Sequence, residues 1–385
     1  MTSRERVTKA FRHEEPDRVP RYEQTVCSRI ASELMGRPMH TGGARIRFEE
    51  TAARYEGEAA WAEYVRQLLA DVGDLIRELD FDIARPPWRH SARPAQKIDE
   101  HTFRYEDREN GLWTVSRYDE VSDVFDQIDS AVRQEGIPAI ERTVLALERA
   151  TEEAGPPRVE DYADLLEVAR RAGGDRFVPS SDGMLMIPPN APWLEACATR
   201  PDLVERYLDC QMEQALRVIP QLPEFGIHGL WAGGDFASTA GPIYSPAMFR
   251  RFLLPRLQKI TAAAHQAGLV YLFRTDGNIW PVAQELLVDS GVDGYGEIDI
   301  DAGMELREIK RQFPHLTLWG GISCGSALVF DRPERIREKV REVMRDCAPG
   351  GGLIFGSSNA VHDGVPTEHF VAMQEAAREF GLYPQ

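Results

Sequence analysis

The sequence has no long hydrophobic run and little cysteine. Nowhere in its 385 residues do about 18 apolar residues follow one another, as a membrane-spanning helix requires. Residues 1–20 are charged throughout and contain no apolar core of a signal peptide. The five cysteines form no C-x-x-C pair and are widely spaced, at Cys27, Cys197, Cys210, Cys324 and Cys347. Such usage is typical of a reducing compartment, so we expect a soluble, cytoplasmic protein with no membrane partner.

Positive charge is also in short supply. There are 45 Lys and Arg residues against 62 Asp and Glu residues, which gives a formal net charge of −17. Binding to nucleic acid or to an anionic membrane needs clustered basic residues, so this balance disfavours both partners. A few buried arginines would still suffice to bind an anionic small molecule, and a small-molecule substrate is what we expect.

The sequence lacks the G-x-G-x-x-G turn that opens many doubly wound open sheets, because nothing like it follows Thr25. Short apolar segments instead alternate eight times with amphipathic helical segments. The expected strands span residues 18–25, 81–87, 176–182, 229–235, 269–274, 294–298, 316–320 and 353–357. Alternation of this kind implies parallel pairing, and eight such units close into a barrel. The predicted fold is therefore an α/β protein with a (β/α)8 TIM barrel.

Local signals mark the ends of some elements. Ser245 as N-cap and Pro246 at the first helical position predict a helix that continues to Ala264. Two alternating apolar and polar runs within residues 99–118 predict a β-hairpin inserted after the second strand. No linker-like, low-complexity stretch divides the chain, so we expect residues 1–385 to form a single barrel domain.

Polar side chains close most of the predicted strands. In a (β/α)8 barrel the active site lies at the carboxyl ends of the strands, so these side chains are candidates for contact with a substrate. The predicted substrate-binding residues are Arg85, Tyr22, Glu23, Trp231, Tyr295, Glu297, Ser358, Asn359 and His362.

Three further strand-end residues are candidates for catalysis. Arg274 and Asp276 follow a core strand on one side of the sheet, since side chains alternate with period two. A charged pair buried there either binds substrate or forms an internal salt bridge that stabilises the barrel mouth. Asp235 follows Gly233 and Gly234 at the end of the preceding predicted strand, 229–235. Asp235, Arg274 and Asp276 are the predicted catalytic residues.

Several segments resemble the uroporphyrinogen decarboxylase and cobalamin methyltransferase superfamily. They read TSRERV and HEEPDRVP near the start, then SPAMFRRF from Ser245, DGNI from Asp276, GGI from Gly320 and APGGG from Ala348. The resemblance extends over nearly the whole chain and implies the same barrel, often as a homodimer.

The resemblance implies two chemistries that need different residues. Orthodox decarboxylases of this superfamily carry an Arg-Gln-Ala-Gly-Arg segment that binds substrate carboxylates, whereas residues 20–25 read PRYEQT here. The corrinoid-linked methyltransferases carry a zinc site made of His-x-Cys after the fifth strand and a Cys near the eighth. The matching positions hold Arg274 and Asp276, and then Ser357 or Ser358. Arginine stays protonated and has no lone pair for a metal, so we expect no metal and no cofactor.

Three functions follow as hypotheses. The first is a metal-free, decarboxylase-like lyase that acts on a carboxylated, cyclic or tetrapyrrole-like substrate, which Arg274 and Arg85 hold while Asp276 assists proton transfer. The second is a methyltransferase or O-demethylase component that works with a corrinoid protein, and with zinc or corrinoid as cofactor. Asp235, Asp276, Glu297 and His362 are the alternative metal ligands under that hypothesis. The third is a barrel that binds a ligand without catalysis.

Overall fold

A curled parallel sheet forms the centre of the computed structural model, which describes residues 1–384. Its six strands lie in the order β12-β11-β10-β9-β6-β5. Their bounds are β5 (Pro179–Ser180), β6 (Gly229–Gly233), β9 (Val270–Arg274), β10 (Gly294–Gly296), β11 (Thr317–Ile322) and β12 (Leu353–Ser357). Every neighbouring pair is parallel, so all six strands end at the same edge of the sheet.

The first two predicted strands make single β-bridges rather than regular strands. The Tyr22 N–H donates to the carbonyl of Phe355 in β12 (2.9 Å), and the Asp82 N–H donates to the Arg21 carbonyl (2.8 Å). The Ala84 N–H then donates to the carbonyl of Phe177, just before β5 (2.9 Å). These bonds link β12 to β5 and are consistent with the predicted eight-stranded barrel.

A buried carboxylate accounts for the irregular pairing at the second segment. The Asp82 side chain binds the guanidinium groups of Arg6 and Arg18, each at 2.6 Å, and accepts the backbone N–H of Arg21 at 2.7 Å. Side-chain contacts therefore replace part of the backbone ladder there.

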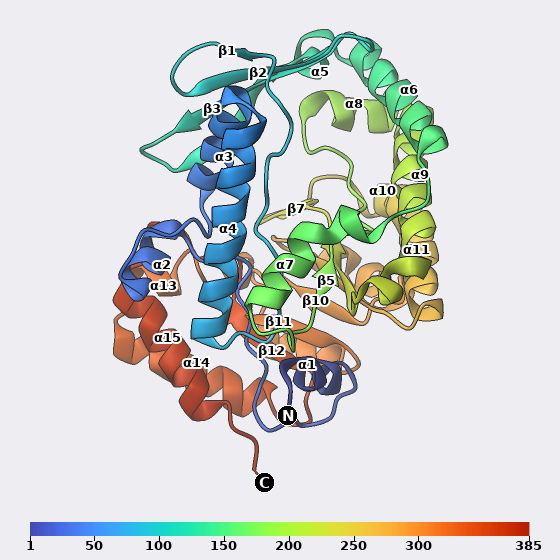
Figure 1. Cartoon of the computed structure of the whole chain (residues 1–385). Coiled ribbons are helices and arrows are strands. Elements are labelled where there is room, and N and C mark those ends of the chain that lie inside the picture. Colours follow the sequence, from blue (N-terminus) through green and yellow to red (C-terminus); the bar gives the residue numbers. More distant parts are fainter. Residues whose placement is uncertain (385) are drawn as a thin grey trace.

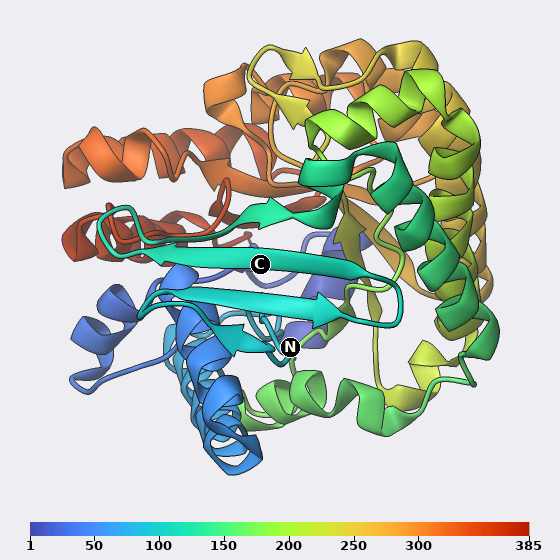
Figure 2. The same ribbon diagram turned by 90° about the horizontal axis from the view of Figure 1, so that it is seen from above.

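Helices cover the outside of the sheet (Figures 1 and 2). The longer ones are α3 (Ala44–Glu56), α4 (Glu58–Leu79), α6 (Ile137–Glu153), α9 (Pro201–Val218), α11 (Leu254–Gln266), α14 (Pro333–Cys347) and α15 (Thr367–Phe380). Shorter helices are α1 (Ser3–Phe11), α2 (Ser28–Met35), α5 (Ala131–Glu135), α7 (Ala163–Arg171), α8 (Ala191–Thr199), α10 (Pro246–Met248), α12 (Leu306–Gln312) and α13 (Ala327–Phe330). None of the helices within residues 1–384 combines the length and the apolar character needed to span a bilayer.

Aromatic side chains from different strands fill the interior of the sheet. Tyr22, Trp231 and Trp319 pack together with ring centroids 5.1–5.8 Å apart. Val7 and Ala10 of α1 belong to the same buried cluster. Helix α1 therefore covers one end of the interior, and the polar strand ends lie at the other.

The predicted helix start at Ser245 is confirmed. The Ser245 hydroxyl accepts the N–H of Met248 at 3.2 Å, and Pro246 occupies the first turn. The helical segment continues through a π-helical turn, η3 (Phe249–Leu253), into α11.

A four-stranded antiparallel sheet stands beyond the barrel mouth, on the side away from α1 (Figure 1). Its strands are β1 (Gln96–Lys97), β2 (Thr102–Asp107), β3 (Leu112–Asp119) and β4 (Val124–Ser130). The hairpin predicted for residues 99–118 was too small, because β1 and β4 extend the β2–β3 pair on both sides. Asp123, before β4, accepts the N–H groups of Ala44 and Arg45 and so attaches the sheet to the start of α3.

Candidate active site

A cavity of about 460 Å³ lies at the carboxyl ends of the parallel strands. Arg274 ends β9, Glu297 directly follows β10, and Asp235 comes two residues after β6. Asp276 and Asn359 follow β9 and β12, and all five side chains line the cavity. The strand-end rule therefore brought together the three predicted catalytic residues and two of the predicted substrate-binding residues.

Three carboxylates meet in this cavity. Asp235, Asp276 and Glu297 each place one oxygen within 4.8 Å of the others. The Asn359 amide donates to Asp276 Oδ2 at 2.6 Å. Three negative charges this close repel one another strongly, so protons or cations must compensate part of the charge.

Arg274 supplies one positive charge, and its partner is Glu297 rather than Asp276. The Arg274 Nη1 to Glu297 Oε1 distance is 2.6 Å, and the two side chains are only 5% and 3% exposed. Gln24 Nε2 donates to the same oxygen at 2.6 Å. The ring of Trp88 faces the guanidinium, whose central carbon lies 5.5 Å from the ring centroid. Arg274 thus forms a buried ion pair at the wall of the candidate active site, with a different partner from the one that the sequence suggested.

Burial and mutual repulsion raise the pKa values of the cluster. Burial, reinforced by the nearby negative charge of Glu297, raises the pKa of Asp276 to about 7, and the Asn359 hydrogen bond opposes the shift. Burial raises the pKa of Glu297 and Arg274 opposes this shift, while loss of hydration also raises the pKa of Asp235. Asp276 is therefore partly protonated near pH 7, where ordinary carboxyl groups are ionised.

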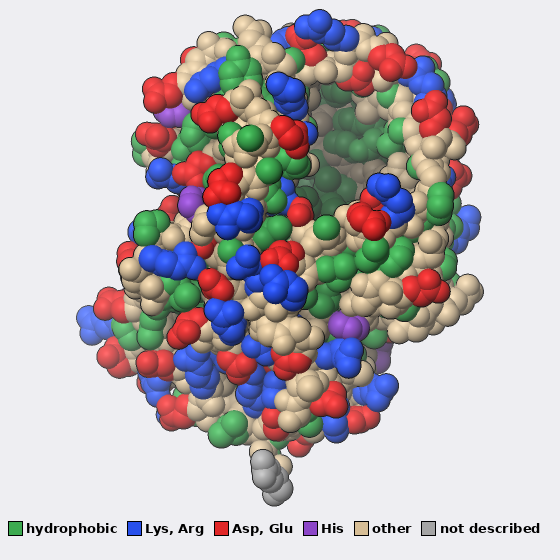
Figure 3. All heavy atoms as spheres, viewed as in Figure 1, with side chains coloured by type: hydrophobic (Ala, Val, Ile, Leu, Met, Phe, Trp, Pro, Cys, Tyr) green, Lys and Arg blue, Asp and Glu red, His purple; other side chains and the backbone are tan. Residues whose placement is uncertain are grey.

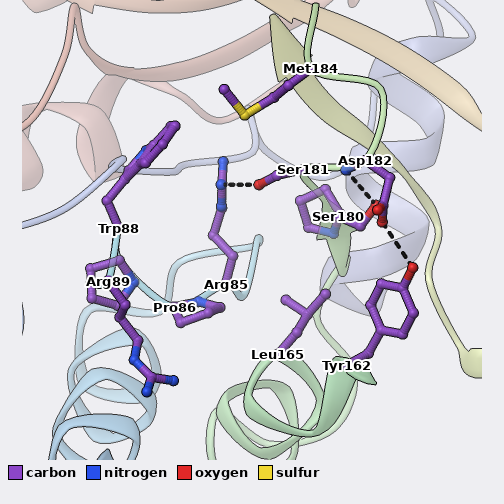
Figure 4. Close-up of a pocket in the computed structure, with 12 residues that line it drawn as sticks. Arg85, Pro86, Trp88, Arg89, Tyr162, Leu165, Ser180, Ser181, Asp182 and Met184 are labelled. Atoms are coloured by element: carbon purple, nitrogen blue, oxygen red, sulfur yellow. Dashed lines mark hydrogen bonds between the residues drawn. The ribbon is translucent and has the colours of Figure 1, made fainter. Parts of the chain in front are cut away.

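Arg85 lines a neighbouring cavity of about 420 Å³ (Figure 4). Its Nη2 donates to the Ser181 hydroxyl at 2.8 Å. Pro87, Trp88 and Met184 line both cavities, so the two spaces adjoin. A larger hollow of about 1090 Å³ shares Ser181 and Met184 with the Arg85 cavity, and a deep hollow with apolar walls is visible on this face of the molecule (Figure 3).

Relatives of the chain point to one family. Residues 190–380 match the family model described as uroporphyrinogen decarboxylase (URO-D). The chain is similar to uroporphyrinogen decarboxylase of Actinobacillus succinogenes, with 27% identity over 147 residues that cover 37% of this chain and 40% of the relative. The enzyme of Shewanella loihica is 26% identical over 183 residues, 46% of each protein. Each match spans less than half the length of the curated relative.

A solved structure shares the fold of this chain over almost its full length. A methyltransferase from Methanosarcina mazei superposes with a TM-score of 0.56, covers 99% of both chains and is 19% identical. Together with the family match, this likeness confirms the resemblance inferred from the sequence motifs.

The zinc site of the superfamily's methyltransferases does not fit these residues. Arg274 occupies the histidine position, and its guanidinium is bound to Glu297. Neither a histidine nor a cysteine joins the carboxylate cluster, which is the only group of three such potential metal ligands within residues 1–384. Three carboxylate oxygens suit hard divalent cations rather than a thiolate zinc centre.

His362 and Ser358 lie at the edge of the site. His362 lines the cavity that contains the three carboxylates, which we call the acid cavity. It is exposed, and its Nε2 contacts the Cys324 carbonyl at 3.1 Å. Ser358 is buried, and its hydroxyl accepts the Cys324 N–H at 3.2 Å. His362 can reach a ligand in the cavity, whereas Ser358 supports the loop that carries Cys324.

Four further predicted substrate-binding residues are buried and, like Ser358, are not among the residues that line the cavities described above. Tyr22, Trp231 and Tyr295 are at most 1% exposed and pack inside the barrel. Glu23 is also buried, and it accepts hydrogen bonds from Ser357 and from Gln374 Nε2 (2.9 Å). Burial raises its pKa to about 7. These four side chains are packed among other residues in this structure, and their contact with a substrate stays a prediction.

Several residues of the site were missed by the strand-end rule. Met184, Met186, Arg47 and Asp123 line the acid cavity from loops and from segments outside the parallel sheet. Gln24 lies within the first predicted strand, residues 18–25, but no sequence pattern predicted its contact with Glu297. The missed residues come from connections whose path over the barrel mouth depends on tertiary packing.

Proposed function

We propose that this chain is a lyase of decarboxylase type that removes a carboxylate as CO2 from a cyclic or aromatic acid without a metal. The observation that carries the proposal is the carboxyl group of Asp276, which lies in a cavity beside Arg274 and has a pKa near 7. A group with this pKa is suited to donate a proton at neutral pH.

The residues divide the reaction between them. Arg85 attracts a substrate carboxylate to the barrel mouth, since a guanidinium is complementary to a carboxylate, and Arg274 stays paired with Glu297 beside the reacting group. The C–C bond to the leaving carboxylate breaks, CO2 departs, and the electron pair stays on the ring carbon. That carbon takes the proton of Asp276, whose carboxylate regains a proton from water.

The neighbours of Asp276 keep it ready for this step. Glu297 and Asp235 hold negative charge close to it and so favour its protonated form. The Arg274–Glu297 pair has both members buried, so it is fixed before substrate binds. Fixed charges of this kind lower a barrier without reorganisation during the reaction.

Release of CO2 from a panel of aromatic and heterocyclic mono- and dicarboxylic acids tests the proposal. Asp276→Asn keeps the shape of the side chain but carries no acidic proton, so we expect turnover to fall by about 100-fold or more. Glu120→Gln is the matched control, because Glu120 is 68% exposed on the small sheet. Full activity in Asp276→Asn would exclude its role as proton donor.

Methyl transfer is the second candidate function, and the carboxylate cluster is the observation that favours it. Three oxygens within 4.8 Å of one another are a possible ligand set for a divalent cation. The structural neighbour from Methanosarcina mazei is a methyltransferase. The sequence resemblance to corrinoid-linked methyltransferases implies a corrinoid protein as the partner in such a reaction. Methyl transfer from a methoxylated acid to an added corrinoid protein, dependent on a bound metal, would support this function over decarboxylation.

A further inference from the structure

The cavity that Arg85 lines, beside the carboxylate cluster, has mostly apolar and aromatic walls, which suit a flat ring (Figure 4). Proline, leucine, methionine, tryptophan and tyrosine side chains make up most of its lining, among them Pro86, Leu165 and Trp88. Trp88 is 47% exposed, which is unusual for a tryptophan, and it stands between this cavity and the acid cavity. Exposed aromatic surface in a concave site commonly contacts a ligand ring.

Arg85 makes no ion pair within residues 1–384, although the charge of Glu297 and the hydroxyl of Tyr22 act on its guanidinium. Arg89 and Arg274, its neighbours in the same region, bind Glu50 and Glu297 through ion pairs. Within residues 1–384, Arg85 donates to the Ser181 hydroxyl and makes no ion pair, and its Nη1 is buried without a hydrogen-bond partner. A guanidinium left in this state at the edge of a cavity is suited to bind an anion.

A second polar pair lies across the cavity from Arg85 (Figure 4). The Tyr162 hydroxyl donates to Asp182 Oδ2 at 3.1 Å, and both residues line the cavity. A carboxylate oxygen of Asp182 can also accept a hydrogen bond from a ligand hydroxyl or amino group.

We propose that this cavity binds the ring of an aromatic acid, with a ring carboxylate on Arg85 and Ser181 and a ring hydroxyl or amino group on Asp182. The proposal rests on the proposed function and names its substrate class. The carboxylate on Arg85 is an anchor that does not react. The group that reacts extends past Trp88 to Asp276 in the adjoining cavity, so the substrate of the lyase is an aromatic dicarboxylate.

Binding of two matched probes to the full chain tests the subsite, with dissociation constants measured by isothermal titration calorimetry. The probes are 4-hydroxybenzoate, which carries the anchor carboxylate, and 4-hydroxybenzamide, which is neutral and of the same shape. We expect the acid to bind at least about tenfold more tightly, because a charge-assisted hydrogen bond contributes that much. Equal binding of the two probes, or no binding of the acid, would overturn the proposal.

Variants assign the effect to Arg85. Arg85→Gln should weaken binding of the acid by about tenfold or more and leave the amide unchanged. Arg108→Gln removes the same charge from a side chain that is 87% exposed on the small sheet, and it should change neither constant. Ser181→Ala should weaken the acid selectively without any change of charge, which keeps the test valid if Arg85→Gln does not fold. Wild-type affinity for the acid in both Arg85→Gln and Ser181→Ala would reject the subsite.

The outcome separates this inference from the proposed function. Arg85-dependent binding of the acid with no CO2 release from any dicarboxylate would retain the subsite and reject the lyase. If CO2 release depends on Asp276 but binding of the acid does not depend on Arg85, the lyase proposal is retained and the anchor carboxylate binds elsewhere.

Discussion

At the scale of the residue, Asp276 sets the pH dependence of the proposed reaction. Its pKa is raised from 3.8 to about 7, so the protonated, active form is present below pH 7 and is lost as the pH rises through that value. We therefore predict that kcat/KM falls with increasing pH around 7. A pH–rate profile measures this fall, and a rate that stays constant up to pH 9 would contradict the assignment.

The same shift affects stability with a defined sign. Asp276 loses its proton near pH 4 in the unfolded chain but near pH 7 in the folded chain. Its contribution to the free energy of unfolding therefore declines as the pH rises from about 4 to 7. Asp276→Asn should flatten the decline in this window, measured by urea unfolding at several pH values. Because burial raises the pKa of Glu23 in the same direction, the decline should persist in part in the variant.

Arg274 is expected to stabilise the fold as well as the site. Arg274→Ala leaves Glu297 buried without its partner, which costs about 3–5 kcal/mol when that carboxylate stays charged. The loss should be larger at pH 8 than at pH 5, because protonation of Glu297 relieves it. Unfolding free energies at the two pH values measure the difference, and Glu297→Gln in the same chain should recover part of the loss. A loss that does not depend on pH would contradict the ion-pair explanation.

At the scale of the element, helix α10 and the segment after it begin at a side-chain cap. The Ser245 hydroxyl accepts the Met248 N–H, so Ser245→Ala removes one of the few hydrogen bonds available to the first turn. We predict a loss of about 1 kcal/mol in stability, with activity retained. Thermal unfolding of the variant checks the size of the loss, and an unchanged melting temperature would show that the cap is dispensable.

Elements with strong periodicity could be predicted from the sequence, and their connections could not. The six regular strands of the sheet all fall within or very near predicted ranges, and the helix predicted to begin at Ser245 is present. Helices α3 and α4 are separated at Gly57, whose φ of +147° is rare for other residues. Strand β4 was missed, because its pairing with β3 depends on a tertiary arrangement that alternation within residues 99–118 does not reveal.

The candidate site could likewise be predicted only in part from the sequence. Asp235, Arg274, Asp276, Glu297 and Asn359 come together because parallel strands end at one edge. Tyr22 and Trp231 also come from predicted strand segments, but their side chains point into the barrel interior. Period-two alternation predicts two opposite faces of a strand but does not show which face points to the barrel mouth. That direction is seen only in the folded structure.

At the scale of the whole molecule, charge is distributed unevenly. The chain carries a net charge of −17, yet Arg85 and Arg274 lie beside the adjoining cavities at the barrel mouth. Arg274 is paired with Glu297, so the local attraction for an anionic substrate comes from Arg85, which makes no ion pair within residues 1–384. This attraction acts over short distances, so we expect binding of a substrate dianion to weaken only moderately with added salt. A titration at 50 mM and at 500 mM salt measures the effect.

The central claim is that protons and Arg274, rather than a metal ion, neutralise the carboxylates of Asp235, Asp276 and Glu297. The most direct test is the divalent metal content of the full chain purified without chelators, measured by mass spectrometry beside a chelator-treated sample. We predict much less than one equivalent of metal per chain and the same activity in both samples. A content close to one equivalent of metal per chain would contradict the claim if Asp276→Asn lost both the metal and the activity. Methyl transfer would then become the leading candidate function.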